Sequence, residues 1–274
     1  MPREAPGFKR LRRGPVEVWV APRHEGVVDA LGLLEPGALE RHLAGRPGEG
    51  GRGPTARLPL GAGGERLLLR LVLHGGLLGR GLGTTLLGLG RPGRELTVTA
   101  ELRAAGAPVP EPVLLVGVRR AGPLWSAAVG TRVEEQTENA RHFLEQAPDA
   151  ATIASAAEAA GHAVRRFHDA GGEHADLHLG NLLLRSDADV CECLVIDLDR
   201  AGRADEVPPA RRMAELARLY RSVVKRSLVA QLGDAGRARF VAAYVGDDRA
   251  LGDAMLRHLP RERLRLRLHR LHYR

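Results

Sequence analysis

Short apolar runs separated by glycine- and proline-rich turns fill the first half of the chain. Between residues 14 and 133, the clearest strand candidates are residues 57–60 and 65–73, and a glycine-rich turn at 48–55 precedes the first of them. Apolar runs of this length, bounded by turn residues, are typical of β-strands. The pattern predicts a small sheet-based lobe.

One segment of this half has the spacing of a helix. Residues 94–105 carry apolar side chains at helix-compatible positions, and Gly106 supplies a stop signal. Two further strand candidates follow, residues 113–118 and 124–129, and the turn-like residues 120–123 separate them. Two apolar runs on either side of a Gly-Pro turn predict a β-hairpin.

The pattern changes after Val133, where alanine-rich segments replace the short apolar runs. Residues 137–146 and 151–169 contain few β-branched residues and have helical spacing, and the chain from residue 208 to its end has the same character. Such segments favour helices over strands. The second half is therefore predicted to be mainly helical.

Two short apolar strands interrupt this helical half, at residues 181–184 and 191–196. The expected fold class is α+β. A sheet-based lobe with one helix is expected over residues 1–133, and a larger, mainly helical lobe over residues 134–274.

Composition is that of a soluble globular protein. The chain has 274 residues, of which 44% are hydrophobic and 27% charged, and this is enough for a substantial core. No apolar run follows the charged N-terminal residues, as a secretory signal would require. The most apolar stretch, residues 67–90, is broken by Arg70, His74 and Arg80, so it is not expected to span a membrane. We expect a cytoplasmic protein.

The net charge of +8 comes almost entirely from arginine, since Lys9 and Lys225 are the only lysines. An anionic partner is one explanation of this excess. A coding bias toward Arg, Ala, Gly and Leu is another, because it would place the same charges on an ordinary solvated surface. A nucleic-acid partner is not expected.

The most specific pattern lies between residues 167 and 199. A loop presents Asp176, Asn181 follows five residues later where an apolar strand begins, and a second strand delivers Asp197. Phosphoryl transfer needs a group that receives the proton of the attacking hydroxyl and oxygen ligands for magnesium. Asp176 suits the first task. Asn181 and Asp197 suit the second, because magnesium prefers oxygen ligands and usually takes one or two carboxylates from the protein.

His174-Ala-Asp176, with Asn181 behind it, resembles the catalytic loop of protein kinases and their small-molecule relatives. Residues 196–199, Ile-Asp-Leu-Asp, stand where protein kinases carry Asp-Phe-Gly, and the missing Phe-Gly argues against a regulated protein kinase. Further stretches are similar to the lipopolysaccharide kinase family: residues 51–55, 69–76, 94–110 and 218–222. The resemblance covers about residues 50–225. It implies a bilobal protein-kinase-like fold with a small antiparallel sheet in the first lobe.

The resemblance also implies a nucleotide site. Gly51, Gly53 and Thr55 would belong to the loop over the ATP phosphates, where missing side chains let backbone N–H groups approach the oxygens. Arg70 would take the strand position that most protein kinases fill with lysine, and Glu95 on the helix would be its partner. Arginine keeps the charge but is bulkier than lysine and not equivalent to it.

Several of these residues also have a structural explanation. Asp176 and Asn181 could be ordinary loop caps. His174 could support the loop or take part in catalysis, and His178 could contact substrate or be an exposed loop histidine. Glu101 competes for the role of the helix carboxylate.

The resemblance implies that ATP and Mg²⁺ are used to phosphorylate a hydroxyl of a 3-deoxy-D-manno-octulosonic acid (Kdo) residue attached to lipid A. A kinase for another small molecule, such as an aminoglycoside-like amino sugar, is an alternative and would need an acidic pocket. A non-catalytic, nucleotide-binding pseudokinase is a second alternative, because Arg70 replaces the usual lysine.

The expected acceptor is anionic and lipid-linked, so the arginine excess could meet an anionic membrane surface on the cytoplasmic face of the inner membrane. Residues 261–274, as a helix, would place Leu264, Leu268 and Leu271 on one line beside many arginines. A basic amphipathic helix of this kind can lie on an anionic membrane. A final helix packed on the larger lobe explains the same pattern.

Overall fold

The computed structural model describes four stretches of the chain: residues 7–45, 53–73, 84–186 and 191–262. Contacts divide the chain into two compact units. The sheet unit consists of Met1–Ala100 and Pro110–Glu134, and the helical unit consists of Glu101–Val109 and Glu135–Arg274. Each unit is described by itself below.

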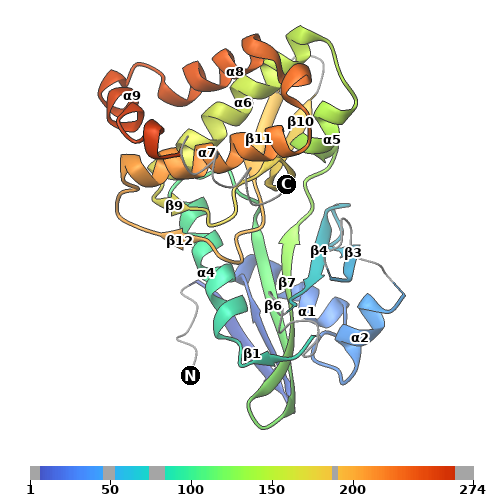
Figure 1. Ribbon diagram of the computed structural model, residues 1–274. Coiled ribbons are helices and arrows are strands. Elements are labelled where there is room, and N and C mark those ends of the chain that lie inside the picture. The colour runs from blue at the N-terminus through green and yellow to red at the C-terminus, as the bar shows by residue number, and fades with distance from the viewer. Residues whose placement is uncertain (1–6, 46–52, 74–83, 187–190, 263–274) are drawn as a thin grey trace. The chain divides into compact units, whose positions relative to one another are not determined.

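An antiparallel sheet of seven strands forms the sheet unit (Figure 1). In order across the sheet, the strands are β1 (Lys9–Arg13), β2 (Val16–Val20), β6 (Pro112–Ala121), β7 (Leu124–Arg132), β4 (Arg66–Leu71) and β3 (Thr55–Pro59), and β5 (Leu86–Leu87) also pairs with β7. Strands β6 and β7 are the predicted hairpin, and the predicted strands before the helix are confirmed as β3 and β4.

Side chains are buried on both faces of this sheet. One face packs against α1 (Gly26–Ala30) and α2 (Ala38–Leu43), and the other packs against the first part of α4 (Gly90–Ala104). From Leu114 onward, residues of β6 alternate between the two cores, with Leu114 in the first and Leu115 in the second. Because strand side chains alternate between faces, a continuous apolar run is what a strand covered on both sides requires.

The predicted helix over residues 94–105 is confirmed as α4, which begins four residues earlier than expected. The expectation of a single helix in this lobe is wrong, because α1 and α2 are also present. These helices have five and six residues. Elements of one to two turns are too short to show a 3.6-residue hydrophobic period in the sequence.

Helices dominate the helical unit. Its elements are β8 (Thr137–Asn139), α5 (Ala140–Glu145), α6 (Ala150–Asp169), β9 (Gly172–Glu173), the 3₁₀ helix η3 (Leu179–Asn181), β10 (Leu182–Ser186), β11 (Cys191–Val195), β12 (Gly202–Arg203), α7 (Pro209–Lys225), α8 (Val229–Val245) and α9 (Arg249–Leu256). The long predicted helices are confirmed, and β10 and β11 are the two predicted strands.

The predicted helix over residues 137–146 is partly wrong. Its first three residues form strand β8, which pairs with β10. The helix begins at Ala140, because Asn139 stays extended and its side chain accepts a hydrogen bond from the backbone N–H of His142 at 3.0 Å. This N-cap satisfies one of the free donors of the first helical turn.

Helix α6 packs very closely on α8. A Cβ atom at Gly161 would lie 2.5 Å from the backbone oxygen of Phe240. Only glycine permits this approach, because the backbone N of Tyr244 and the Cβ atom of Ala243 also lie within 3.2 Å of that position. The predicted tail helix over residues 261–274 falls almost wholly outside the described residues. Within the described part of the chain, every helix is too short or too polar to cross a membrane.

Candidate active site

Strands β10 and β11 bring the predicted catalytic-loop residues together in the helical unit. The two strands are antiparallel and pair Leu182 with Val195. At the next position of the pairing, the backbone N–H of Ile196 donates a hydrogen bond to the carbonyl of Asn181 at 2.9 Å. Asn181 therefore lies beside Ile196, the residue that precedes Asp197, although 15 positions separate Asn181 from Ile196 in the sequence.

His174 ties the loop to the end of β11. Its Nδ1 accepts a hydrogen bond from the backbone N–H of Asp176 at 3.1 Å, and its Nε2 lies 3.1 Å from the carbonyl oxygen of Ile196. Since a carbonyl only accepts, these bonds assign the proton to Nε2 and make the ring neutral. The residue is 2% exposed. Both ring nitrogens are thus occupied by backbone groups.

Asp176 combines a fixed backbone with an accessible carboxylate. Its N–H is bound to His174, and its carbonyl accepts a hydrogen bond from Nδ2 of Asn181 at 3.0 Å. Its side chain is 68% exposed, and Oδ2 lies 3.8 Å from Nε2 of His178. An exposed carboxylate on an anchored backbone can meet a substrate hydroxyl without a large change of the loop.

Asn181 is 1% exposed, so its polar atoms must be satisfied inside the protein. Its Nδ2 donates to the carbonyl of Asp176, and this bond identifies the other terminal atom of the amide as the oxygen. His178 contributes locally, since its Nδ1 accepts a hydrogen bond from the N–H of Gly180 at 3.0 Å and caps η3. The loop is therefore closed by hydrogen bonds at both ends.

The backbone of Asp197 adopts a left-handed conformation, with φ of 66°. Non-glycine residues rarely adopt this region, and strained positions of this kind concentrate at functional sites. Within the described residues, the non-glycine residues with positive φ are Gln136, Ala147, Asp197 and Ser227. Asp197 is the one among them that the sequence analysis selected for its chemistry.

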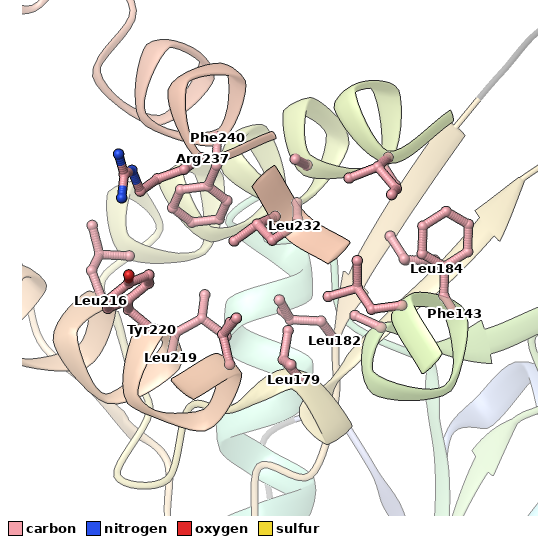
Figure 2. Close-up of a pocket in the computed structure, with 17 residues that line it drawn as sticks. Phe143, Leu179, Leu182, Leu184, Leu216, Leu219, Tyr220, Leu232, Arg237 and Phe240 are labelled. Atoms are coloured by element: carbon pink, nitrogen blue, oxygen red, sulfur yellow. The ribbon is translucent and has the colours of Figure 1, made fainter. Parts of the chain in front are cut away.

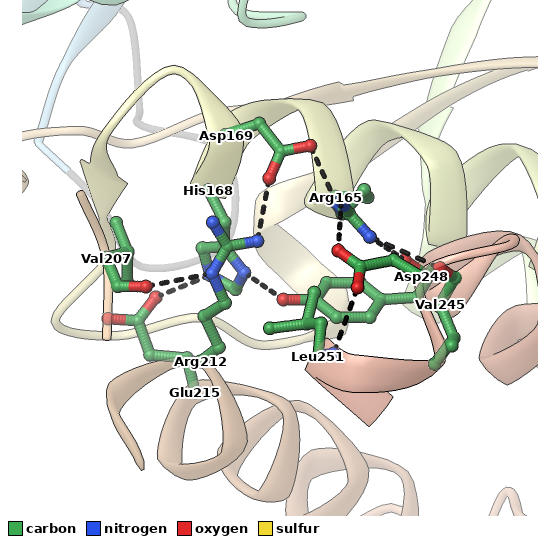
Figure 3. A network of polar contacts seen from close by, with 10 residues as sticks. Arg165, His168, Asp169, Val207, Arg212, Glu215, Val245, Asp248 and Leu251 are labelled. Carbon is green, nitrogen blue, oxygen red and sulfur yellow. Dashed lines mark hydrogen bonds and ion pairs between the residues drawn. The ribbon is translucent and has the colours of Figure 1, made fainter. Parts of the chain in front are cut away.

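A buried polar network supports the loop from behind (Figure 3). Oε2 of Glu215, on α7, accepts a hydrogen bond from the backbone N–H of His174 at 2.9 Å and lies 3.2 Å from Nε2 of His168. On the other side of that ring, Nδ1 of His168 lies 2.7 Å from the hydroxyl of Tyr244. Glu215 and His168 are both fully buried.

Burial determines the protonation of this network. Desolvation lowers the pKa of His168, although Glu215 acts in the opposite direction, and desolvation raises the pKa of Tyr244 to about 12. His168 is therefore neutral, with Nε2–H donating to Glu215 and Nδ1 accepting from Tyr244. Arg212 adds a hydrogen bond to Asp169 at 2.7 Å and another to the carbonyl of Val207 at 2.9 Å.

Helix α7 also explains the stretch 218–222, which the sequence analysis noted without assigning a role. Nη1 of Arg218 donates to the carbonyl of His174 at 3.2 Å, and Oγ of Ser222 accepts from the N–H of Leu179 at 3.0 Å. These side chains, one helical turn apart, anchor the two halves of the loop.

Arg70 and Glu95 form an ion pair in the sheet unit, between β4 and α4. The side chain of Glu95 is 7% exposed and that of Arg70 is 23% exposed. Glu101, the alternative carboxylate, instead lies 3.8 Å from Arg203 in the helical unit. Glu95 is thus the carboxylate that directs Arg70.

The predicted phosphate loop is only partly described. Thr55 lies opposite Arg70 in the β3–β4 ladder. Gly53 is buried, and a Cβ there would lie 2.8 Å from Cγ of Leu73, so packing against this side chain also requires glycine. Gly51 lies outside the described residues.

An apolar hollow of about 650 Å³, its opening included, lies behind the loop in the helical unit (Figure 2). Leu179 and Leu182, on either side of Asn181, belong to its wall, and among the described residues Tyr220 and Arg237 are its polar lining. A sugar or a nucleotide needs more hydrogen-bonding partners than this wall offers. This hollow is therefore not the expected site of a nucleotide or a sugar.

The donor set fits magnesium better than a transition metal. The described residues contain no group of three or more His, Cys, Asp and Glu side chains that could hold a metal. The predicted ligands Asn181 and Asp197 would supply one amide oxygen and one carboxylate. Such hard donors suit a cation that keeps several waters and binds substrate phosphates.

The sheet unit, the helical unit and the loop between β9 and β10 define a protein with a kinase-like fold. A solved structure described as WaaP in complex with acyl carrier protein matches this fold with a TM-score of 0.55, covering 87% of this chain and 97% of that chain at 23% sequence identity. The predicted bilobal, kinase-like α+β class is confirmed.

The sequence model of the lipopolysaccharide kinase (Kdo/WaaP) family matches residues 77–244, which is more than half of the chain. The chain belongs to this family. It is similar to 3-deoxy-D-manno-octulosonic acid kinases from Xanthomonas axonopodis pv. citri (strain 306) and Stenotrophomonas maltophilia (strain K279a), with 33% identity to each. The first match covers 58% of this chain and 61% of its relative, and the second covers 65% and 69%. The chain thus spans less than two thirds of the Xanthomonas protein.

Proposed function

We propose that this protein transfers the γ-phosphoryl group of ATP to a hydroxyl of a Kdo residue attached to lipid A. The observation that carries the proposal is the exposed carboxylate of Asp176 on a loop whose backbone is fixed by His174 and Asn181. The names of the relatives support the acceptor, since both matched proteins are described as Kdo kinases.

Asp176 is the group that receives the proton. The acceptor hydroxyl oxygen forms a bond to the γ-phosphorus, its proton moves to the Asp176 carboxylate, and the bond from the γ-phosphorus to the bridging oxygen breaks to release ADP. His174 is a positioning residue in this scheme, because both of its ring nitrogens are bound to backbone groups. It holds Asp176 and the end of β11 at a fixed separation.

Asn181 and Asp197 are the residues that would hold Mg²⁺. The cation, when bound, would neutralise charge on the phosphate oxygens. Burial and the bond to Asp176 fix the side chain of Asn181. The left-handed backbone conformation of Asp197, two residues after the end of β11, restricts the direction of its side chain.

In the sheet unit, Arg70 would bind the ATP phosphates and Glu95 would direct it. Their ion pair supports an active enzyme over a pseudokinase, because a guanidinium held by a buried carboxylate keeps its charge and can contact phosphate in two places. Gly51, Gly53 and Thr55 complete this proposed nucleotide site.

The proposed acceptor also requires access to a membrane. Lipid A is anchored by its acyl chains, so we place the reaction at the cytoplasmic face of the inner membrane, with the protein bound peripherally to anionic lipid. The net charge of +8 favours this location.

An acceptor panel tests the proposal. The protein would be incubated with γ-labelled ATP and Mg²⁺ and offered Kdo-bearing lipid A, lipid A without Kdo, an aminoglycoside, or no acceptor. Label in the first product alone is expected. Label in the aminoglycoside would identify a different small-molecule kinase, and nucleotide binding without transfer to any acceptor would support the pseudokinase alternative.

A further inference from the structure

One end of the sheet unit gathers arginine and exposed apolar side chains. The β1–β2 turn and the β6–β7 turn lie side by side there, joined by a hydrogen bond of 2.9 Å from the N–H of Arg119 to the carbonyl of Pro15 (Figure 1). Strand β5 joins the same end, because Leu87 pairs with Leu124. We call this end the basic tip and define it by its members: Arg12, Arg13, Leu87, Arg119 and Trp125.

Within the described residues, the basic tip carries arginines that form no ion pair with a carboxylate. Arg12, Arg13 and Arg119 are exposed. The acidic residue of the adjoining strand, Glu17, is buried and already binds Arg10 and the indole N–H of Trp19 at 2.7 and 2.6 Å. Three exposed guanidinium groups therefore remain on one end of a small sheet.

Apolar side chains stand among these charges. Leu87 is 76% exposed, more than any other large hydrophobic side chain of the described residues. Trp125 is half-buried, pairs with Leu86 across β5 and β7, and carries the guanidinium of Arg119 5.3 Å from the centre of its ring. Leu87 follows Leu86 on the edge strand β5, so Leu87 and Trp125 lie at the same end of the sheet.

This combination has the chemistry of a membrane interface. Tryptophan is favoured at the level of lipid head groups, where its ring is partly apolar and partly polar. Arginine is attracted by anionic head groups, and moving a leucine side chain out of water is favourable. Nucleic acid would use the arginines but would leave Leu87 in water.

We propose that the basic tip docks on an anionic phospholipid surface, with the arginines at the lipid phosphates and with Leu87 and Trp125 at the boundary of head groups and acyl chains. The proposal deepens the function proposed above, since it names the surface that would bring the enzyme to a lipid-linked acceptor. The binding itself does not depend on catalysis, so the two can fail separately.

Vesicle co-sedimentation tests the proposal. Phosphatidylcholine vesicles with about one third phosphatidylglycerol would be compared with neutral vesicles at low and high salt. The variant Arg12→Gln/Arg13→Gln is expected to bind the anionic vesicles about 25-fold more weakly, at about fivefold per basic residue. Leu87→Ser is expected to lose about tenfold at either salt concentration.

Helix α9 offers matched controls, because Arg249 and Arg257 are also exposed and Leu256 is 58% exposed. Arg249→Gln/Arg257→Gln changes the net charge by the same amount, and Leu256→Ser removes a similar side chain. Both are expected to bind vesicles like the wild type. Equal losses in the controls and the tip variants would overturn the proposal, as would no vesicle binding by the wild type.

Two further readouts complete the design. All variants should phosphorylate a deacylated, water-soluble Kdo acceptor at the wild-type rate, because the basic tip has no part in the chemistry. If the wild type binds vesicles through the tip but phosphorylates nothing, the docking surface stands and the proposed reaction fails. Release of the protein from vesicles by an equal mass of double-stranded DNA, with tighter binding to the DNA, would contradict the lipid surface.

Discussion

Nδ1 of His174 accepts a hydrogen bond from the backbone N–H of Asp176, only two residues further along the chain. The same ring reaches the carbonyl of Ile196 with its other nitrogen. One neutral imidazole thus sets the position of the proposed proton acceptor relative to Ile196, which follows β11 and precedes Asp197. The ring itself is buried, so in the proposed reaction it would act by positioning Asp176.

Asp197 is expected to show opposite effects on stability and on nucleotide binding. Asp197→Gly removes the strain of a left-handed non-glycine residue and should raise the free energy of unfolding by about 0.5–1 kcal/mol. It also removes a proposed magnesium ligand, so Mg²⁺ should no longer strengthen nucleotide binding. Urea unfolding and titration with a fluorescent nucleotide, with and without Mg²⁺, measure the two effects.

Ser227 provides the control for this prediction. Its φ is 59° and it is exposed at the end of α7, so Ser227→Gly should bring a similar gain in stability. Its nucleotide binding should keep the magnesium dependence of the wild type. If Asp197→Gly retained that dependence as well, Asp197 would not be a magnesium ligand.

Variants of Arg70 and Glu95 can distinguish the contribution of this pair to stability from its contribution to nucleotide binding. Arg70→Met removes the cation that lies beside the buried Glu95 carboxylate and should cost about 2–3 kcal/mol of unfolding free energy. Arg70→Met/Glu95→Leu should restore most of this stability, because neither charge remains. Chemical denaturation measures both variants.

Nucleotide affinity then decides the role of the pair. The stable double variant should bind ATP at least tenfold more weakly than the wild type, since it has lost the proposed phosphate-binding cation. Arg70→Lys, which keeps a cation, should fall between the two. Wild-type affinity in the double variant would remove Arg70 from the nucleotide site.

His168 is expected to make stability depend on pH. Burial lowers its pKa below the ordinary value of 6.5, while unfolding returns the ring to that value. Above about pH 6.5 the ring is neutral in both states and its contribution is fully present. As the pH falls below 6.5, His168 becomes protonated in the unfolded state but stays neutral in the folded state. The free energy of unfolding therefore decreases.

The decrease should be at most about 1.4 kcal/mol per pH unit for this single group, and urea unfolding between pH 7.5 and 5 measures it. His168→Gln should flatten the slope over this range. His162→Gln, an exposed histidine on the same helix, should leave the slope unchanged. An equal slope in the wild type and in His168→Gln would show that His168 is not the group responsible.

Local patterns made the loop and the strands predictable from the sequence. His174, Asp176 and Asn181 lie within eight residues, so a fixed spacing describes them, and Asp197 follows a short apolar strand that could be recognised by itself. The β6–β7 hairpin was predictable for the same reason, since its turn residues lie between two apolar runs.

Long-range contacts were not predictable. Glu215 supports His174 from 41 positions away, and His168 reaches Tyr244 across 76 positions. A buried glutamate on a helix has the same appearance in the sequence as an exposed one, apart from its position relative to the apolar face. The stretch 218–222 was the only signal that α7 contributes to the loop.

Asp176→Asn tests the proposed transfer of a proton from the Kdo hydroxyl to Asp176. The side chain is 68% exposed, so the substitution should leave the melting temperature and the affinity for ATP close to those of the wild type. Asp253→Asn, at an exposed aspartate of α9, is the matched control. The rate of labelled phosphate incorporation into Kdo-bearing lipid A should fall by about 100-fold or more in Asp176→Asn and remain unchanged in the control. Incorporation by Asp176→Asn within a few-fold of the wild-type rate would contradict the account.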